Sequence, residues 1–251
     1  MDLNTLKSVI LGVVEGLTEF APVSSTAHIL LSGNLLKIAS SEFFNVFTVA
    51  IQSGAILAAV FFFFRIISKN LSLVPKIIVG FIPTAILGIL IQPFLSKIFA
   101  NTYIIGITLI VGGIIFLFIK PIEEETHIKD ISYKESFIIG LTQVLAFIPG
   151  VSRSGATLIG GTALKIPRSQ IVVFSFLLGI PTILGASFIE LRSIPSLTFS
   201  QWLLILVGAV TAFITAILTI KWFIKILTKK PLSWFGWYRI VVGVIVLIFI
   251  K

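Results

Sequence analysis

The sequence predicts an all-α polytopic membrane protein, with six transmembrane helices and two re-entrant helix–loop–helix pairs in an inverted-topology repeat. Three observations predict this fold: an apolar composition, six long apolar runs, and two further apolar runs with polar centres. Of the 251 residues, 57% are hydrophobic and 12% are charged, and the mean hydropathy is +1.14. A soluble domain of this size cannot bury so much apolar surface, so lipid is the expected solvent.

The composition excludes several other classes of protein. It does not fit a cytosolic enzyme, a disordered chain or a secreted disulfide scaffold, and the chain has no cysteine for a disulfide, an iron–sulfur cluster or a thiolate zinc site. The net charge of +9 could suit nucleic acid. The basic residues, however, lie in short loops between apolar runs, so we expect membrane topology and no nucleic-acid partner. Glu15 and Glu19 interrupt the first apolar run and no A-x-A signal follows, so no removable signal peptide is expected.

Six runs are long enough to be transmembrane helices. They are Phe43–Phe64, Ile77–Leu95, Thr102–Ile119, Ile171–Ile189, Trp202–Ile220 and Ile240–Ile250. The last run is short, but Trp234–Tyr238 extends it with aromatic residues that suit a membrane interface. A span needs about 20 residues to cross about 30 Å, so the shorter helices are expected to tilt or to use flanking anchors.

Two regions, Val9–Leu36 and Phe137–Leu164, each consist of two short apolar arms around a polar tip. The residues that interrupt the apolar sequence are Glu15, Glu19, Pro22, Ser24, Ser25, Thr26 and His28 in the first region, and Gln143, Pro149, Gly150, Ser152, Arg153, Ser154 and Gly155 in the second. A helical arm of about 14 residues reaches roughly 21 Å, so each region is predicted to enter and leave the membrane on one side. Non-helical backbone at that depth must be buried in protein or line a wet cavity. The tips are therefore candidate sites.

The two broken regions resemble each other in sequence. Residues 16–19 read Gly-Leu-Thr-Glu and residues 140–143 read Gly-Leu-Thr-Gln, while Pro-Val-Ser-Ser at 22–25 loosely matches Pro-Gly-Val-Ser-Arg-Ser at 149–154. Three candidate spans follow each region, which predicts repeats of about 7–120 and 134–250 within a single domain of residues 1–251. An odd number of spans inverts the second copy, and broken helices of inverted repeats meet near the bilayer midplane.

The basic residues predict the orientation. If the loop after the first span is inside, the inside segments carry Arg65, Lys69, Lys76, Lys120, Lys129, Lys134, Lys165, Arg168, Lys221, Lys225, Lys229, Lys230 and Arg239. The outside segments then carry Lys7, Lys37, Lys97, Arg192 and Lys251. This bias predicts a multi-pass plasma-membrane protein with both termini outside, the first tip entering from the outer side and the second from the inner side.

Glu15 and Glu19 are the only acidic residues inside an apolar run. Their i, i+4 spacing places both carboxylates on one helical face, where like charges repel at low dielectric. A divalent cation would remove that cost, and oxygen ligands suit Mg²⁺ or Ca²⁺. The alternatives are a solvated helix face and a carboxylate pair that shares one proton.

The first tip also offers hydroxyls and an imidazole. Ser24, Ser25 and Thr26 could cap the following helix, and one of them could be a nucleophile if a base lies beside it. His28 could serve as an acid/base group, a nucleophile or a ligand, or it could be a hydrogen-bonded core residue.

The second tip is predicted to bind an anion. Arg153 is interpreted as the only basic residue outside the loops and helix ends. It lies where a helix begins, with Ser152, Ser154, Gly155 and Thr157 around it, and free N–H groups with a neighbouring guanidinium suit phosphate oxygens. Gln52, in a Gln-Ser-Gly break of the first span, and Gln143, at the repeat position of Glu19, could line the cavity or join helices.

Carboxylates, a metal ion, an arginine and a hydroxyl are the groups needed for phosphoryl transfer, and the membrane setting suggests a lipid-linked phosphate. Two alternatives stay open. The first is a flippase or transporter for lipid phosphates, since inverted repeats with broken helices are typical of transporters. The second is an ion-coupled transporter with Glu15 and Glu19 as a proton relay, which the Ser, Thr and Arg of the tips favour less.

Residues 14–28 closely resemble the first signature of the undecaprenyl-diphosphate phosphatase family of the bacitracin-resistance type, and residues 149–157 resemble its second. The resemblance covers essentially the whole chain, although Ala27 stands where many members have glycine. It implies ten segments in inverted repeats and removal of the terminal phosphate from a C55-type polyprenyl diphosphate, which recycles the carrier lipid of cell-wall synthesis.

The same resemblance implies a role for each residue. It makes Glu15 and Glu19 the acidic and metal-binding pair, Ser25 the nucleophile, His28 an acid/base group or alternative nucleophile, and Arg153 the phosphate clamp. Direct attack by water stays open as an alternative to Ser25. The sequence also leaves open whether the protein forms a homodimer.

Overall fold

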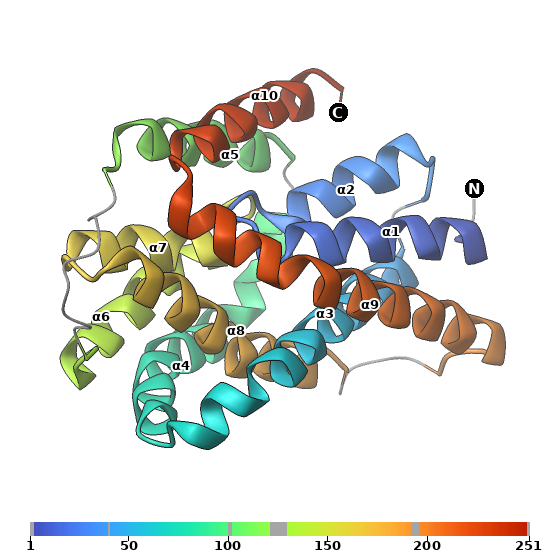
Figure 1. Ribbon diagram of the computed structural model, residues 1–251. Helices are drawn as coiled ribbons and strands as arrows, with labels where there is room; N and C mark the ends of the chain where they lie inside the picture. Colours follow the sequence, from blue (N-terminus) through green and yellow to red (C-terminus); the bar gives the residue numbers. More distant parts are fainter. Residues whose placement is uncertain (1–2, 40, 100–101, 121–129, 192–195, 250–251) are drawn as a thin grey trace.

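The computed structural model describes residues 3–39, 41–99, 102–120, 130–191 and 196–249, and the regular elements of this part of the chain are all helices (Figure 1). The helices are α1 (Thr5–Thr18), α2 (Ser25–Leu35), α3 (Glu42–Lys69), α4 (Leu73–Phe99), α5 (Thr102–Phe118), α6 (Tyr133–Gln143), η1 (Val144–Phe147), α7 (Arg153–Ala163), α8 (Arg168–Leu191), α9 (Phe199–Lys229) and α10 (Ser233–Phe249). Lys129, Arg192 and Lys251 of the charge pattern lie outside the described residues.

Hydroxyl side chains cap the starts of α2, α3, α6, α7 and α9. Ser41 caps α3 by accepting a bond from the N–H of Phe44, and Ser132 and Thr198 form capping boxes at α6 and α9. Such caps satisfy N–H groups that a helix leaves free at its first turn. The starts of these capped helices therefore follow from the local sequence.

Both broken regions fold as predicted, into two short helices around a non-helical tip. Between α1 and α2 the first tip spans residues 19–24, and between α6 and α7 the second tip spans residues 144–152 and includes η1. The second helices end alike: Lys37 after α2 and Lys165 after α7 both have positive φ, and Ile38 and Ile166 each donate to the carbonyl of a glycine five residues earlier. This likeness supports the prediction of two repeats.

Helices from the first half of the chain pack against helices from the second half, and corresponding helices of the two halves have corresponding partners. α1 lies on α9 and α6 lies on α4, while α3 packs on α8 and α5 packs on α10 along one edge of the molecule (Figure 1). Gly16 of α1 approaches the carbonyl of Ala212, and Gly140 of α6 approaches the backbone of Gly80, so closely that a Cβ atom has no room. Gly16 and Gly140 occupy the same position in the predicted repeat, which further supports it.

Helix α3 is continuous, so the expected break at Gln52–Gly54 is wrong. Gly54 lies against the backbone of Ala209 in α9, where a larger side chain would clash. Ser53 donates a hydrogen bond of 2.9 Å to Ser187 of α8. These polar and small residues join helices and do not end one.

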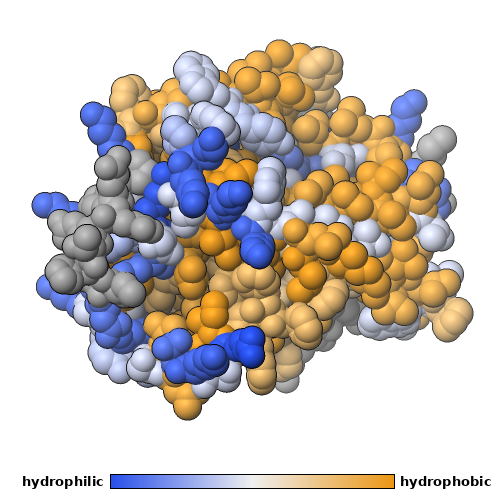
Figure 2. All heavy atoms as spheres, viewed as in Figure 1, coloured by the Kyte–Doolittle hydropathy of each residue, from blue (hydrophilic) through white to orange (hydrophobic). Residues whose placement is uncertain are grey.

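Among the described residues, four helices are long and apolar enough to cross a membrane: Glu42–Lys69, Leu73–Ile91, Arg168–Glu190 and Phe199–Lys229. The other two predicted spans are α5 and α10, each of 17 residues or about 26 Å. Figure 2 shows apolar residues over most of the right half of the viewed face, while hydrophilic residues gather mainly toward its left side. An apolar outer surface of this extent is that of a multi-pass membrane protein.

The structure corrects one part of the charge pattern. Arg239 was assigned to an inside segment, but it lies within α10 and only 2% of its surface is exposed. Arg239 therefore lies away from loops and helix ends, whereas Arg153 is the first residue of α7.

Candidate active site

The two tips meet inside the helix bundle. The hydroxyl of Ser154 donates to the carbonyl of Ala21 over 3.2 Å, which joins the start of α7 to the first tip. Beside this contact lies a cavity of about 120 Å³, large enough for a small polar group and too small for a lipid tail. Its lining residues are Glu19, Ser24, Ser25, Thr26, Gln52, Ala146, Val151, Ser152, Arg153 and Ile183.

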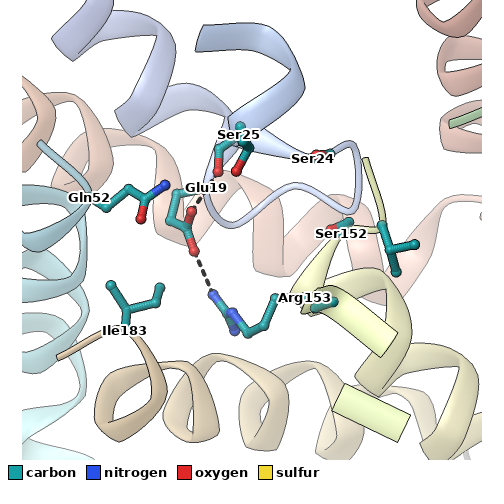
Figure 3. A pocket seen from close by; sticks show the side chains of 10 residues that line it. Glu19, Ser24, Ser25, Gln52, Ser152, Arg153 and Ile183 are labelled. Atoms are coloured by element: carbon teal, nitrogen blue, oxygen red, sulfur yellow. Dashed lines mark hydrogen bonds and ion pairs between the residues drawn. The ribbon is translucent and has the colours of Figure 1, made fainter. Parts of the chain in front are cut away.

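Glu19 lies at the centre of the cavity and joins both tips (Figure 3). Its backbone N–H closes the last turn of α1 on the carbonyl of Glu15, so the end of that helix fixes its position. One carboxylate oxygen accepts the hydroxyl proton of Ser25 over 2.7 Å, and the other accepts Nη2 of Arg153 over 2.9 Å. The side chains of Glu19 and Arg153 are only 6% and 10% exposed, so little water screens this ion pair.

Arg153 is held on its other side by α8. Its Nη1 donates to the carbonyl of Ser175 over 2.9 Å, and Gly179 leaves the space that the guanidinium fills. The hydroxyls of Thr157 and Ser175 lie 2.6 Å apart behind it. Ser175 has no motif around it that could have indicated this role.

The helix starts add positive potential to the cavity. Ser24 and Ser152 are the N-caps of α2 and α7, and Ser25 and Arg153 are the first residues of these helices. Two helix N-termini with a guanidinium between them attract an anion. Gln52 of α3 points toward Glu19 from the opposite wall (Figure 3).

Glu15 lies one turn behind Glu19 and does not line the cavity. Its side chain is fully buried, and neither carboxylate oxygen has a hydrogen-bond partner among the described residues. Buried oxygens without partners are uncommon and suit a cation or a proton. Within the described chain no group of three or more His, Cys, Asp or Glu side chains converges, so protein side chains alone supply a small ligand set.

His28 lies outside the cavity lining, and both of its ring nitrogens have partners. Nδ1 lies 2.7 Å from the carbonyl of Ser24, and Nε2 lies 2.8 Å from the hydroxyl of Tyr238 in α10. The two rings are stacked with their planes 2° apart. His28 therefore supports the backbone at Ser24, and both of its ring nitrogens are bonded to groups other than the Ser25 hydroxyl.

Four other predicted residues also lie away from the cavity lining. Gln143 is buried and donates to the hydroxyls of Thr84 and Thr182 over 2.8 and 2.9 Å, so it joins α6 to α4 and α8. Ser154, Gly155 and Thr157 lie on the first turns of α7, where their bonds hold the second tip and its helix start.

The lining includes three apolar residues that the sequence analysis missed: Ala146, Val151 and Ile183. Val151 lies inside the second motif, so the motif itself could have indicated it. Ala146 and Ile183 carry no chemical signal, because only the packing of η1 and α8 brings them to the cavity.

Comparison with known proteins identifies the family of this chain. A family model described as "Bacitracin resistance protein BacA" matches residues 8–245. The chain belongs to this family.

Proteins named undecaprenyl-diphosphatase are similar to this BacA-family chain over nearly their whole length. The one from Persephonella marina is 43% identical over 254 residues, which cover 99% of this chain and all of the relative. The one from Flavobacterium johnsoniae is 40% identical, covering 98% and 96% of the two chains. The one from Aquifex aeolicus is 38% identical, covering 95% and 96%.

Proposed function

We propose that this protein hydrolyses undecaprenyl diphosphate to the monophosphate and inorganic phosphate, and so recycles the carrier lipid of cell-wall synthesis. The observation that carries the proposal is Glu19, which holds the Ser25 hydroxyl on one oxygen and Arg153 on the other inside a small anion-attracting cavity. Relatives named undecaprenyl-diphosphatase cover nearly the whole chain. No comparison favours the flippase alternative.

In this proposal Ser25 is the nucleophile and Glu19 is its base. The Ser25 oxygen attacks the terminal phosphorus while its proton passes to Glu19, with which it already shares a hydrogen bond. The bond between that phosphorus and the bridging oxygen breaks, and undecaprenyl monophosphate leaves. Water then attacks the phosphorus of the phosphoserine, and the bond between that phosphorus and the Ser25 oxygen breaks. The Ser25 oxygen takes back the proton that Glu19 holds, and the protons of the attacking water leave on inorganic phosphate.

Arg153 is proposed to bind the terminal phosphoryl group. Its guanidinium already faces the cavity, and the Ser175 carbonyl and Gly179 fix its orientation. The planar fork suits two phosphoryl oxygens and opposes the charge that develops during transfer. Ser24, Thr26, Gln52 and Ser152 line the same space and are proposed to bind the substrate's diphosphate.

A divalent cation, Mg²⁺ or Ca²⁺, is proposed to bind at Glu15 and Glu19. The unpartnered, buried oxygens of Glu15 fit such an ion, and substrate oxygens and water would complete an oxygen ligand set. When bound, the ion would neutralise the diphosphate charge. The protein's own residues hold the nucleophile, the base and the guanidinium in place.

The topology proposed for this chemistry has six spans and two re-entrant pairs, with both termini outside. The matched helix ends after α2 and α7 and the matched pairs α1–α9 and α6–α4 support an inverted repeat. In that arrangement the two tips reach the cavity from opposite sides of the membrane.

Phosphate release by the purified protein in detergent tests the function. With undecaprenyl diphosphate as substrate, we expect release that a chelator abolishes and that Ser25→Ala lowers by at least about 1000-fold. Ser68→Ala, at an exposed serine near the end of α3, is the matched control and should retain full activity. Chelator-resistant release would remove the cation from the proposal, and full activity of Ser25→Ala would leave water as the nucleophile. A folded wild type that binds the lipid without releasing phosphate would overturn the hydrolase.

A further inference from the structure

We propose that Arg239 of α10 is a positioning residue that holds the two tips in register on either side of the cavity. This inference rests on the proposed function for its catalytic consequence. The motifs do not contain Arg239, which lies 82 residues beyond the end of the second of them.

Arg239 makes hydrogen bonds to both tips at once. Its Nη1 donates to the carbonyl of Pro22 in the first tip over 2.9 Å, and its Nη2 donates to the carbonyl of Gly150 in the second tip over 3.1 Å. A third bond, of 3.3 Å, runs from Nη2 to the carbonyl of Thr108 in α5. One rigid guanidinium therefore fixes the distance between two loops that are far apart in the sequence.

The residues around Arg239 leave space for its guanidinium and contact it. Gly112 leaves the space for the guanidinium, and the Phe116 ring centroid lies 5.6 Å from its central carbon. No carboxylate of the described residues pairs with it, although buried arginines are usually paired with one. Carbonyl oxygens from the two tips replace that partner, so Nη1 and Nη2 both bond to the tips only when both tips are in place, while Nε has no partner among the described residues.

The tips also have secondary anchors on the same pair of helices. Tyr238, next to Arg239, bonds to His28, whose other ring nitrogen lies against the carbonyl of Ser24. On α5, the hydroxyl of Thr108 donates to the carbonyl of Pro149 over 2.5 Å. The α5–α10 pair thus holds both tips from behind.

Arg239 is placed to affect the reacting groups without touching them. Pro22 lies three residues before Ser25, and Gly150 lies three residues before Arg153. A displacement of about 1 Å between reacting groups can lower a rate by about 100-fold. Loss of the Arg239 bonds is therefore expected to lower kcat and to leave KM nearly unchanged, because Arg153 still binds the phosphoryl group.

The experiment compares Arg239→Met, Arg239→Lys and Arg65→Met in the full-length protein. Methionine keeps an unbranched side chain and removes all donors, whereas lysine keeps the charge on a single nitrogen that cannot reach both carbonyls as a fork does. Arg65 is an exposed arginine near the end of α3 and provides the matched control. The measurements are kcat and KM for phosphate release and amide hydrogen exchange of peptides that cover residues 19–25 and 148–153.

We expect Arg239→Met to lower kcat by about 100-fold and Arg239→Lys by at least about tenfold, with KM within about threefold of wild type. Both tip peptides should exchange faster, and peptides from the centres of α3 and α8 should not. Activity of both variants within twofold of Arg65→Met, or unchanged exchange in the tips, would overturn the proposal. If Arg239→Met does not fold, Arg239→Lys decides the question. If the wild type releases no phosphate, the proposed function fails, and the exchange of the two tips still tests the role of Arg239.

Discussion

The two broken regions share one backbone plan and carry different chemistry. In each, an N-cap serine starts the second helix, Ser24 in one and Ser152 in the other, and the next residue faces Glu19. That next residue is Ser25 in the first region and Arg153 in the second, and they bind opposite oxygens of the same carboxylate. The position of Glu19 itself is taken by Gln143, which joins helices away from the cavity. The comparison teaches that the site is asymmetric: one region supplies the carboxylate and the hydroxyl proposed as base and nucleophile, and the other supplies the guanidinium.

The tips also differ in length and in backbone strain. Five positions separate Glu19 from Ser24, whereas nine separate Gln143 from Ser152. In the longer second tip the positive φ falls on Gly150, and Ser152 has an ordinary φ of −70°. In the shorter first tip Ser24 itself takes a φ of 70°, which is rare for a residue with a side chain. The short connection thus places its strain beside the proposed nucleophile.

Replacing Glu19 by glutamine, the residue that the second region has at the matching position 143, should have the largest effect on phosphate release. Glu19→Gln removes the proton acceptor of Ser25 and the charge that pairs with Arg153, so we expect kcat for phosphate release to fall by about 10⁴-fold. Gln143→Met, at the matching position, removes only bonds to Thr84 and Thr182 and should keep kcat within a few-fold in folded protein. Equal losses in both variants would contradict the asymmetry.

Arg153→Lys tests the cation of the second region. Lysine keeps the charge and loses the fork that bonds to Glu19 and to the Ser175 carbonyl together. We expect kcat/KM to fall by about 100-fold with a clear rise in KM, measured by phosphate release over a range of substrate concentrations. A fall confined to kcat would assign Arg153 to aligning Glu19 and not to binding the phosphoryl group. Lys134→Met in α6, where the lysine is exposed, is the control for loss of a basic residue.

His28 and Ala156 both lie four residues beyond their N-cap serines. Only the first region, whose N-cap Ser24 has a positive φ, has a histidine at this position. Because His28 holds the Ser24 carbonyl and the Ser25 hydroxyl donates to Glu19, we expect His28→Ala to lower kcat by about tenfold only. The pH–rate profile should keep its shape, as measured by phosphate release from about pH 5 to 9. Loss of one limb of the profile would show that His28 transfers a proton. Tyr238→Phe, which removes the other partner of the ring, should have a smaller effect of the same kind.

The sequence predicted much of the fold because the signals were local. Apolar runs, capping residues and the repeated Gly-Leu-Thr motif located the broken regions and most spans. Glu19, Ser25 and Arg153 were predicted because polar residues at the centre of apolar runs are costly unless they have a function. Their direct contact with one another could not be read from sequence, since it depends on how α1, α2 and α7 meet.

Arg239 shows where such reasoning fails. The last apolar run begins at Ile240 with Trp234–Tyr238 as its aromatic extension, and Arg239 between them is counted among the charges of the inside segments. Its burial depends on Gly112 of α5 and on carbonyls of both tips, which no local pattern connects to it. His28 shows that nearness in the sequence does not fix the contacts of a side chain. It is near Ser25 in the sequence, yet its ring nitrogens bond to the Ser24 carbonyl and to Tyr238 of α10.

Replacing each of the two N-cap serines by glycine should have the smallest effect. The two substitutions should change the stability of the fold in opposite directions. At Ser24, glycine relieves the positive φ, worth about 1–3 kcal/mol, and loses a cap worth a few tenths of a kcal/mol, so Ser24→Gly should stabilise the fold by about 1 kcal/mol. At Ser152 no strain exists, so Ser152→Gly loses the cap and the bond to Ser154 and should destabilise it by less than about 1 kcal/mol.

Thermal unfolding in detergent, followed by tryptophan fluorescence, measures both variants. For a chain of this size 1 kcal/mol corresponds to about 2–4 °C in Tm, so the two midpoints should lie on opposite sides of the wild type. If Ser24→Gly also loses activity, the strained serine has been kept for its place beside Ser25 and not for stability, as expected of strain at a functional site. Destabilisation by both substitutions to the same extent would mean that the short first tip stores no strain at Ser24.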